Sequence, residues 1–134
     1  DESILLTGPY TPLIDLFANI NADLLSLEFS TPRAGEIKSL LADERLRNKI
    51  ILGLGVLNPR FDEKEDVDVI YNRAKEALAF IDKENLWQNP DCGFATFSNR
   101  PVNEYENIRA KVGAMIKARD RLRAEYEWWH KLFF

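Results

Sequence analysis

The sequence predicts an α/β protein with a parallel sheet. Three short runs, at residues 23–29, 49–57 and 86–93, alternate with segments whose apolar residues recur at helical spacing. The first two runs are nearly all apolar, which is typical of strands buried on both faces, and strands separated by helices pair in parallel. The 134 residues allow one domain but are too few for a complete eight-stranded barrel of about 250 residues.

The first predicted unit is a strand followed by a helix. Residues 23–29 end before a proline and a glycine, as a buried strand would. Apolar residues at helical spacing then predict a surface helix over residues 36–41. Ahead of this unit, residues 10–20 predict another helix, and residues 3–7 are either the strand before it or no strand at all.

Two further units follow the same order. Residues 49–57 predict the second strand, and an acidic stretch after it starts a helix whose apolar face runs from Val67 to Ile81. The third strand lies in residues 86–93. A long helix is expected to start at Asn103, with Glu106 placed to close a capping box.

Composition excludes several classes of protein. The net charge of −4 argues against a nucleic-acid-binding protein, and no apolar run approaches the roughly 20 residues of a membrane span. No charged-then-apolar leader opens the sequence. The single cysteine, Cys92, excludes an intrachain disulfide and a zinc site built from several thiolates of this chain. We therefore expect a soluble, cytoplasmic protein with neither nucleic acid nor membrane as a partner.

Polar residues follow each predicted strand, at the edge where active sites of parallel α/β folds lie. Glu28 ends a strand otherwise rich in leucine, and a buried carboxylate needs a cation or hydrogen-bond donors. Its partner is either a metal or an ion-paired Arg33 or Arg60. Cys92 lies in a sharply bending stretch, as either an exposed ligand or a buried inert thiol.

The motifs around these residues resemble the carboxyl-terminal part of the cobalamin-independent methionine synthase family. They are Leu27-Glu28-Phe29, Gly53-Leu54-Gly55-Val56 with Pro59-Arg60, and above all Asn89-Pro90-Asp91-Cys92-Gly93 after Leu86-Trp87. The likeness runs from about Gly8 to Arg123. Two strings look closest to shorter, single-barrel relatives: Thr31-Pro32-Arg33-Ala34-Gly35 and Phe94-Ala95-Thr96-Phe97.

The resemblance implies a partial (βα)8 TIM barrel. Residues 1–134 would be its carboxyl-terminal portion, about the last three to four βα units, truncated at the amino terminus. It also implies one zinc ion, held by a His-x-Cys pair, by Glu28 and by Cys92. Such a zinc site activates the homocysteine thiol, which accepts a methyl group from a donor to give methionine. No further catalytic or substrate-binding residue is assigned.

The sequence departs from the family pattern in two respects. It has no His-x-Cys pair, so either the metal site is lost or the pair lies upstream of Asp1, which we favour. The only histidine, His130, lies in the aromatic tail from Trp128 to Phe134, beyond the likeness, where packing is a simpler role than metal binding. Folate-using members also carry a His-Ser-Pro-Arg string, whose histidine is missing from the corresponding residues 56–60.

Three functions remain open at this point. The first is an enzyme fragment, inactive alone, that is completed by a missing amino-terminal barrel half or by another copy of the chain. The second is a half-barrel that has lost its metal and serves as an assembly or interaction module. The third is a related zinc enzyme that activates another thiol, such as coenzyme M. The methyl donor, whether folate, corrinoid or partner protein, is not specified by these residues.

Overall fold

A parallel sheet forms the centre of the molecule. The computed structural model describes residues 7–95 and 102–133, with side chains as far as residue 127. In this part of the chain the sheet has three strands in the order β1-β2-β3, all parallel. They are β1 (Leu24–Glu28), β2 (Ile51–Leu57) and β3 (Leu86–Pro90). The predicted α/β class with a parallel sheet is confirmed, whereas continuation of the sheet into a barrel stays a prediction.

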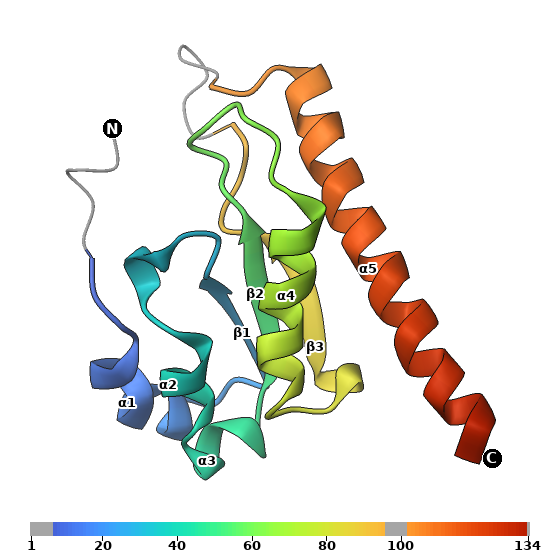
Figure 1. Ribbon diagram of the computed structural model, residues 1–134. Coiled ribbons are helices and arrows are strands. Elements are labelled where there is room, and N and C mark those ends of the chain that lie inside the picture. Colours follow the sequence, from blue (N-terminus) through green and yellow to red (C-terminus); the bar gives the residue numbers. More distant parts are fainter. Residues whose placement is uncertain (1–6, 96–101, 134) are drawn as a thin grey trace.

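Helices connect the strands (Figure 1). They are α1 (Ile14–Asn19), α2 (Ile37–Leu41), α3 (Glu44–Arg47), α4 (Val67–Leu78) and α5 (Tyr105–Phe133), with 3-10 turns at Thr11–Leu13, Pro32–Ala34 and Lys83–Asn85. α4 packs against β2, β3 and α5, so it covers the middle of the sheet. No helix in the described ranges is both long enough and apolar enough to cross a bilayer.

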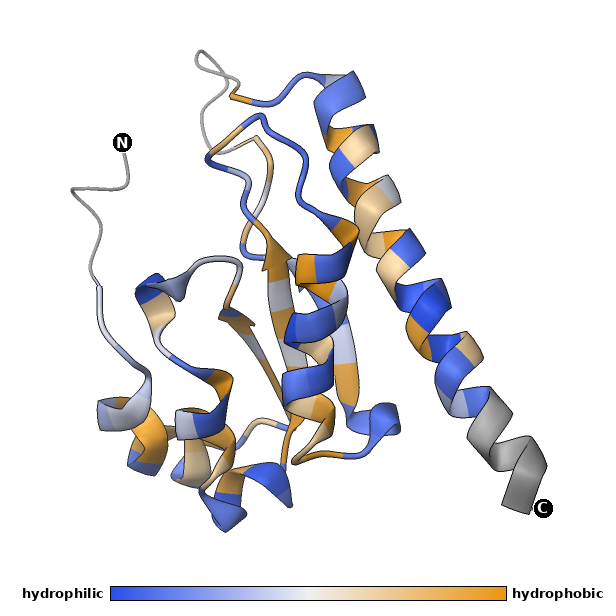
Figure 2. Cartoon of the chain, viewed as in Figure 1, coloured by the Kyte–Doolittle hydropathy of each residue, from blue (hydrophilic) through white to orange (hydrophobic). Residues whose placement is uncertain are grey.

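The two faces of the sheet differ in their surroundings. Leu52 and Leu54 of β2 are fully buried and belong to a core shared with α2, α4 and α5. In Figure 2 the apolar colour gathers on β1 and β2 and on the flank of α5 nearest α4. Ser26, Gly53 and Trp87 are register partners on the opposite face, where Trp87 is 56% exposed. The described residues therefore cover one face and leave the other open.

Two helix boundaries differ from the predictions. One surface helix was predicted over residues 36–41, but a second helix, α3, follows it, capped by Asp43, whose side chain accepts a hydrogen bond from the Arg45 amide. The long helix begins at Tyr105, and not at Asn103 as predicted. Asn103 is buried, and its Nδ2 donates to the Pro59 carbonyl, 2.7 Å away. The alternatives for residues 3–7 fall almost wholly outside the described residues.

Glycines in the central strand let side chains of β3 reach β1. Asn89 Nδ2 donates to Ser26 Oγ at 3.1 Å, and a Cβ on Gly53 would lie 2.8 Å from Asn89 Oδ1. A Cβ on Gly55 would lie 2.3 Å from Asp91 Oδ1, and 2.7 Å from a backbone oxygen of β1. No real Cβ approaches another atom so closely. Residue 55 must therefore be glycine for Asp91 to cross β2.

Asp91 uses this space to tie the third strand to the first. Its Oδ1 accepts from the amides of Phe29 and Ser30, at 3.2 and 3.1 Å, and its Oδ2 accepts from Ser30 Oγ. One carboxylate thus satisfies three donors just after β1 ends. The loops that follow β1 and β3 are held together as a result.

We expect Gly55→Ala to lower the free energy of unfolding by about 1 to 3 kcal/mol, because the new methyl group must displace Asp91 or the backbone of β1. Gly113→Ala is the matched control, since nothing lies within 4 Å of a Cβ at that helical position. It should raise stability by up to about 1 kcal/mol. Urea unfolding followed by circular dichroism measures both changes, and equal effects would contradict the crossing geometry.

Candidate functional site

The ends of the three strands place the predicted residues at one edge of the sheet. Glu28 is the last residue of β1, Asn58 follows β2, and Cys92 comes two residues after β3. Because the strands are parallel, all three carboxyl ends lie on the same side. This is the edge where the loops into α2, α4 and α5 emerge (Figure 1).

Glu28 is held by two arginines. Its Oε2 accepts from Arg33 Nη2 at 2.5 Å, and its Oε1 accepts from Arg60 Nη2 at 3.0 Å. The carboxylate is 29% exposed, so neither ion pair lies free in solvent. Burial alone would lower the pKa of Arg60, but the hydrogen bond and charge of Glu28 outweigh it and raise that pKa. The expected ion pair is confirmed, with both arginines at once.

Tyr10 fixes the backbone at the same residue. The Glu28 amide donates to Tyr10 Oη at 3.0 Å, and the tyrosine ring meets Phe29 edge-on, with centroids 5.3 Å apart. Burial, the largest cause, raises the pKa of Tyr10. Sequence reasoning missed this contact, because nothing in a helical pattern around residue 10 indicates that its hydroxyl reaches the next strand.

Cys92 is an exposed free thiol, so the alternative of a buried inert cysteine is wrong. Partial burial raises its pKa most, and the negative charges of Glu28 and Asp91 raise it further. The positive charge of Arg60 acts in the opposite direction. Glu28 and Cys92 are thus close enough to feel each other's charge. The structure brings the two predicted ligands into one neighbourhood.

A buried lysine anchors the loop that carries Arg60. Lys111 is fully buried in α5, where its Nζ donates to the carbonyls of Asn58 and Glu63 at 3.1 and 2.6 Å. It also pairs with Glu65 Oε1 at 3.0 Å. Sequence reasoning missed this role. The one signal that could have revealed it is the place of Lys111 on the helix, beside the apolar residues Ile108 and Val112, where a side chain is expected to be buried.

Asn58 is part of the same loop. Asn58 is 5% exposed. Its side-chain Oδ1 accepts a hydrogen bond from the backbone N–H of Arg60 at 3.0 Å, and its backbone N–H donates to Glu65 Oε1 at 2.7 Å. The side chain therefore shapes the turn that places Arg60. This geometry favours a structural role for Asn58 over contact with a substrate.

The donor atoms available for a metal are a carboxylate oxygen and a sulfur. Both are of the type that zinc accepts, and zinc sites with three or four protein ligands are the rule. Within the described ranges no group of three or more His, Cys, Asp or Glu could hold a metal ion. Glu28 and Cys92 are thus compatible with zinc by the type of their donor atoms alone, and such a site would need further ligands. The side chains of residues 128–133, including His130, are not described, although the backbone there belongs to α5, and Thr96 and Phe97 lie outside the described residues.

Comparison with known proteins points to one family. The family model described as cobalamin-independent synthase, catalytic domain, matches residues 8–120. A Listeria innocua protein named 5-methyltetrahydropteroyltriglutamate–homocysteine methyltransferase is 35% identical over 118 residues. A Xylella fastidiosa protein of the same name is 32% identical over 119 residues. The two alignments cover 88% and 87% of this chain, but only 14% of either relative.

A solved structure shares the fold. It is titled as a B12-independent methionine synthase from a Shewanella species in complex with selenomethionine, and it matches with a TM-score of 0.73 at 21% identity. The match covers 91% of this chain and 33% of that chain. The present chain thus spans a small part of its relatives.

We expect Lys111→Met to lower the free energy of unfolding by about 3 to 5 kcal/mol, because it leaves Glu65 and two carbonyls without their buried cation. Lys117→Met, on the exposed side of the same helix, should change it by no more than about 0.5 kcal/mol. Urea unfolding measures both variants. A loss of similar size in the two would argue that Lys111 does not anchor the loop.

Charges near Cys92 should move its pKa in opposite directions. Glu28→Gln removes a negative charge and should lower the pKa of the thiol, whereas Arg60→Gln removes a positive charge and should raise it. Thiolate absorbance at 240 nm against pH reads this one cysteine alone. Glu44→Gln, on exposed α3, is the control and should leave the titration unchanged. If neither site variant moved it, Glu28 and Cys92 would not share a neighbourhood.

Proposed function

Because the chain belongs to the cobalamin-independent methionine synthase family, we propose that it is part of the catalytic domain of an enzyme that methylates homocysteine. In the proposed reaction the homocysteine thiol loses its proton, its sulfur forms a bond to the methyl carbon, and the bond from that carbon to the donor breaks. The products are methionine and the demethylated donor. The proposal covers the complete enzyme, and the 134-residue chain alone is expected to be inactive.

One observation carries the proposal beyond family membership. Glu28 and Cys92 are 64 positions apart in sequence, yet the charge of the carboxylate raises the pKa of the thiol. They come from the ends of β1 and β3 at the edge where parallel α/β enzymes place their chemistry. A carboxylate oxygen and a sulfur at this edge are both donor types that zinc accepts.

We infer that Glu28 and Cys92 would each supply one ligand to a zinc ion, with the remaining ligands coming from outside the described residues. When bound, zinc stabilises the thiolate form of a thiol substrate, which is the nucleophile. Arg33 and Arg60 hold the carboxylate of Glu28 at the edge of the sheet, and Asp91 fixes the loop that carries Cys92. These contacts restrict both ligands to one side of the sheet.

The methyl donor is proposed to need no proton from the loop after β2. The curated relatives are named for 5-methyltetrahydropteroyltriglutamate. In a His-Ser-Pro-Arg string the histidine stands two positions before the proline, where this chain has Leu57, which is fully buried. Neither Leu57 nor Asn58 can act as an acid at neutral pH. These residues therefore suit a methyl donor that gives up its methyl group without taking a proton from the loop after β2.

A second function is favoured by a different observation. Both carboxylate oxygens of Glu28 already face arginines, so the residue is satisfied without a metal. This geometry suits a half-barrel that has lost its metal and serves as an assembly or interaction module. A third function, the activation of a thiol other than homocysteine, would use the same two ligands. Comparison of homocysteine with coenzyme M as methyl acceptors distinguishes this function from the methylation of homocysteine.

Zinc binding by a chimera tests the proposal. The matched 118-residue segment of the Listeria innocua relative is replaced by the corresponding part of this chain, which restores whatever ligands the relative supplies upstream. We expect one zinc per chain by elemental analysis and methionine formation from homocysteine. Glu28→Gln and Cys92→Ser should each weaken zinc binding at least about tenfold in competition with a chromophoric chelator.

The control is Glu44→Gln in the same chimera, which removes an exposed carboxylate remote from the strand ends and should leave zinc affinity unchanged. A folded chimera that binds no zinc would support the metal-free module. Zinc binding that is indifferent to both Glu28→Gln and Cys92→Ser would overturn the ligand assignment.

A further inference from the structure

The loops around Glu28 are held by two separate sets of contacts. Asp91 ties the loop after β3 to the loop after β1, because its carboxylate accepts from the amides of Phe29 and Ser30. The loop after β2, residues 58–66, is bound instead to α5 and to the residues just before it. Four of its carbonyls accept from side chains there: those of Asn58 and Glu63 from Lys111, that of Pro59 from Asn103, and that of Asp62 from Asn107. Glu28 thus lies between contacts based on β1 and contacts based on α5.

Arg60 reaches Glu28 from the side of α5. Its Nη2 donates to Glu28 Oε1 at 3.0 Å, whereas its Nη1 is buried and has no hydrogen-bond partner among the described residues. An arginine can hold a carboxylate through two parallel hydrogen bonds, and here Arg60 uses one of its terminal nitrogens. The place of its guanidinium therefore depends on the backbone of the loop, where Asn58 Oδ1 holds the Arg60 amide.

Arg33 reaches the same carboxylate with a different support. It lies in the turn Pro32–Ala34, which follows β1 directly, and its Nη2 donates to Glu28 Oε2. The Arg33 carbonyl accepts from the Gly8 amide at 3.0 Å, so the segment before α1 holds this turn. The two oxygens of Glu28 are thus held by arginines whose loops are anchored to different parts of the molecule.

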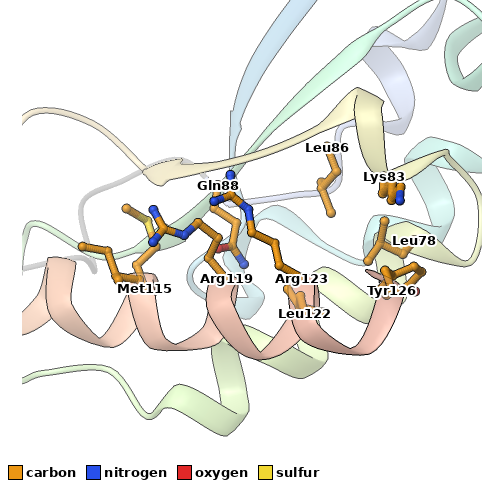
Figure 3. A pocket seen from close by; sticks show the side chains of 10 residues that line it. Leu78, Lys83, Leu86, Gln88, Met115, Arg119, Leu122, Arg123 and Tyr126 are labelled. Carbon is orange, nitrogen blue, oxygen red and sulfur yellow. The ribbon is translucent and has the colours of Figure 1, made fainter. Parts of the chain in front are cut away.

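A cavity of about 370 Å³ lies between β3 and residues 115–126 of α5. Leu86 and Gln88 line it from the strand, and Met115 and Arg119 line it from the helix (Figure 3). α5 packs mainly against α4 and β2, and Glu125 ties it to α4. Close packing against β3 therefore does not set the position of α5, nor that of the loop bound to it.

We propose that Lys111 is a positioning residue for Glu28: by binding the loop after β2 to α5 it keeps Arg60 on Glu28 Oε1, while Arg33 holds Oε2 independently of α5. Lys111 acts through Asn58, whose carbonyl it holds and whose side chain holds the Arg60 amide. Loss of this anchor withdraws Arg60 and leaves Oε1 open to a cation. The inference rests on the proposed function only in this last step, where the cation would be zinc.

Double-mutant cycles test the proposal on the 134-residue chain in EDTA. Arg60→Gln and Arg33→Gln are each made alone and together with Lys111→Gln, which keeps a hydrogen-bond donor but loses the charge. Urea unfolding gives the equilibrium constant of unfolding for every variant. With Lys111→Gln present, the effect of Arg60→Gln on this constant should be at least about fivefold smaller, and that of Arg33→Gln should change by less than about twofold.

The control is Glu125→Gln, which removes the ion pair between α5 and Lys75 of α4, away from the loop after β2. It should leave the effects of both arginine variants unchanged. If Lys111→Gln reduced the effects of both arginine variants, or of neither, the proposal would be overturned. If Glu125→Gln reduced the effect of Arg60→Gln as much as Lys111→Gln does, Lys111 would have a structural role alone, which also contradicts the proposal.

Amide hydrogen exchange followed by NMR is a second measurement, and it needs no variant of Lys111. In the unaltered chain, at urea concentrations below the unfolding transition, the amides of Asn58 and Arg60 should exchange through the same opening as those of α5. The amides of Phe29 and Ser30 should exchange through a different one. The two pairs are matched, because each amide donates to a side-chain oxygen. A common opening for both pairs would overturn the proposal, even if Lys111→Gln failed to fold.

The outcome is independent of the metal proposal, because no measurement here uses zinc, substrate or activity. A chimera that binds no zinc would leave the coupling between Lys111 and Arg60 to be decided by these experiments. Absence of that coupling would leave the assignment of Glu28 and Cys92 as ligands untouched.

Discussion

The candidate site depends on a missing side chain in the middle of the sheet. Asp91 can reach the backbone after β1 only because residue 55 has no Cβ, and that reach joins the loops on either side of the central strand. In the described part of the chain, the other direct side-chain link that crosses β2 joins Asn89 to Ser26 within the strands, so Asp91 is the contact that joins the loops themselves. The passage of Asp91 over Gly55 thus holds the loop after β3 against the loop after β1.

Glu28 stands between two competing kinds of partner. Two arginines satisfy its carboxylate as it is, and each of them also affects the surroundings of Cys92. A metal ion at this edge would have to compete with guanidinium groups for the same oxygens. The two arginines offset the free-energy cost of partly burying the Glu28 carboxylate. A metal ion that binds this carboxylate would have to displace the same ion pairs. The balance between these partners decides whether the edge is a metal site or an ion-pair network.

The pattern of the sequence predicted the elements well because burial follows local periodicity. The apolar runs at residues 23–29 and 49–57 contain β1 and β2, and the acidic start before Val67 coincides with the Asp66 cap of α4. The neighbourhood of Glu28 and Cys92 was predicted from topology, since parallel strands end together.

Contacts between distant segments were not predictable in the same way. The position of Lys111 beside apolar residues indicates burial, but nothing local reveals that its partner is a loop about 50 residues away. Nothing local reveals either that the side chain of Asn103 bonds to Pro59, two residues before α5 begins. The crossing by Asp91 depends on the register between three strands, which periodicity does not specify. Such contacts are decided by which polar groups remain unsatisfied once the core has packed.

The order of the strands has a consequence for synthesis of the protein. Neighbours in the sheet are neighbours in sequence, and each strand joins the one made just before it. A nascent chain can therefore add one of these strands at a time as it leaves the ribosome, although the loop after β2 gains its buried cation only once α5 has been made. Because each strand pairs with its neighbour in sequence, a gene could gain or lose a strand and its helix at either end of this sheet while the remaining strands stay paired with each other.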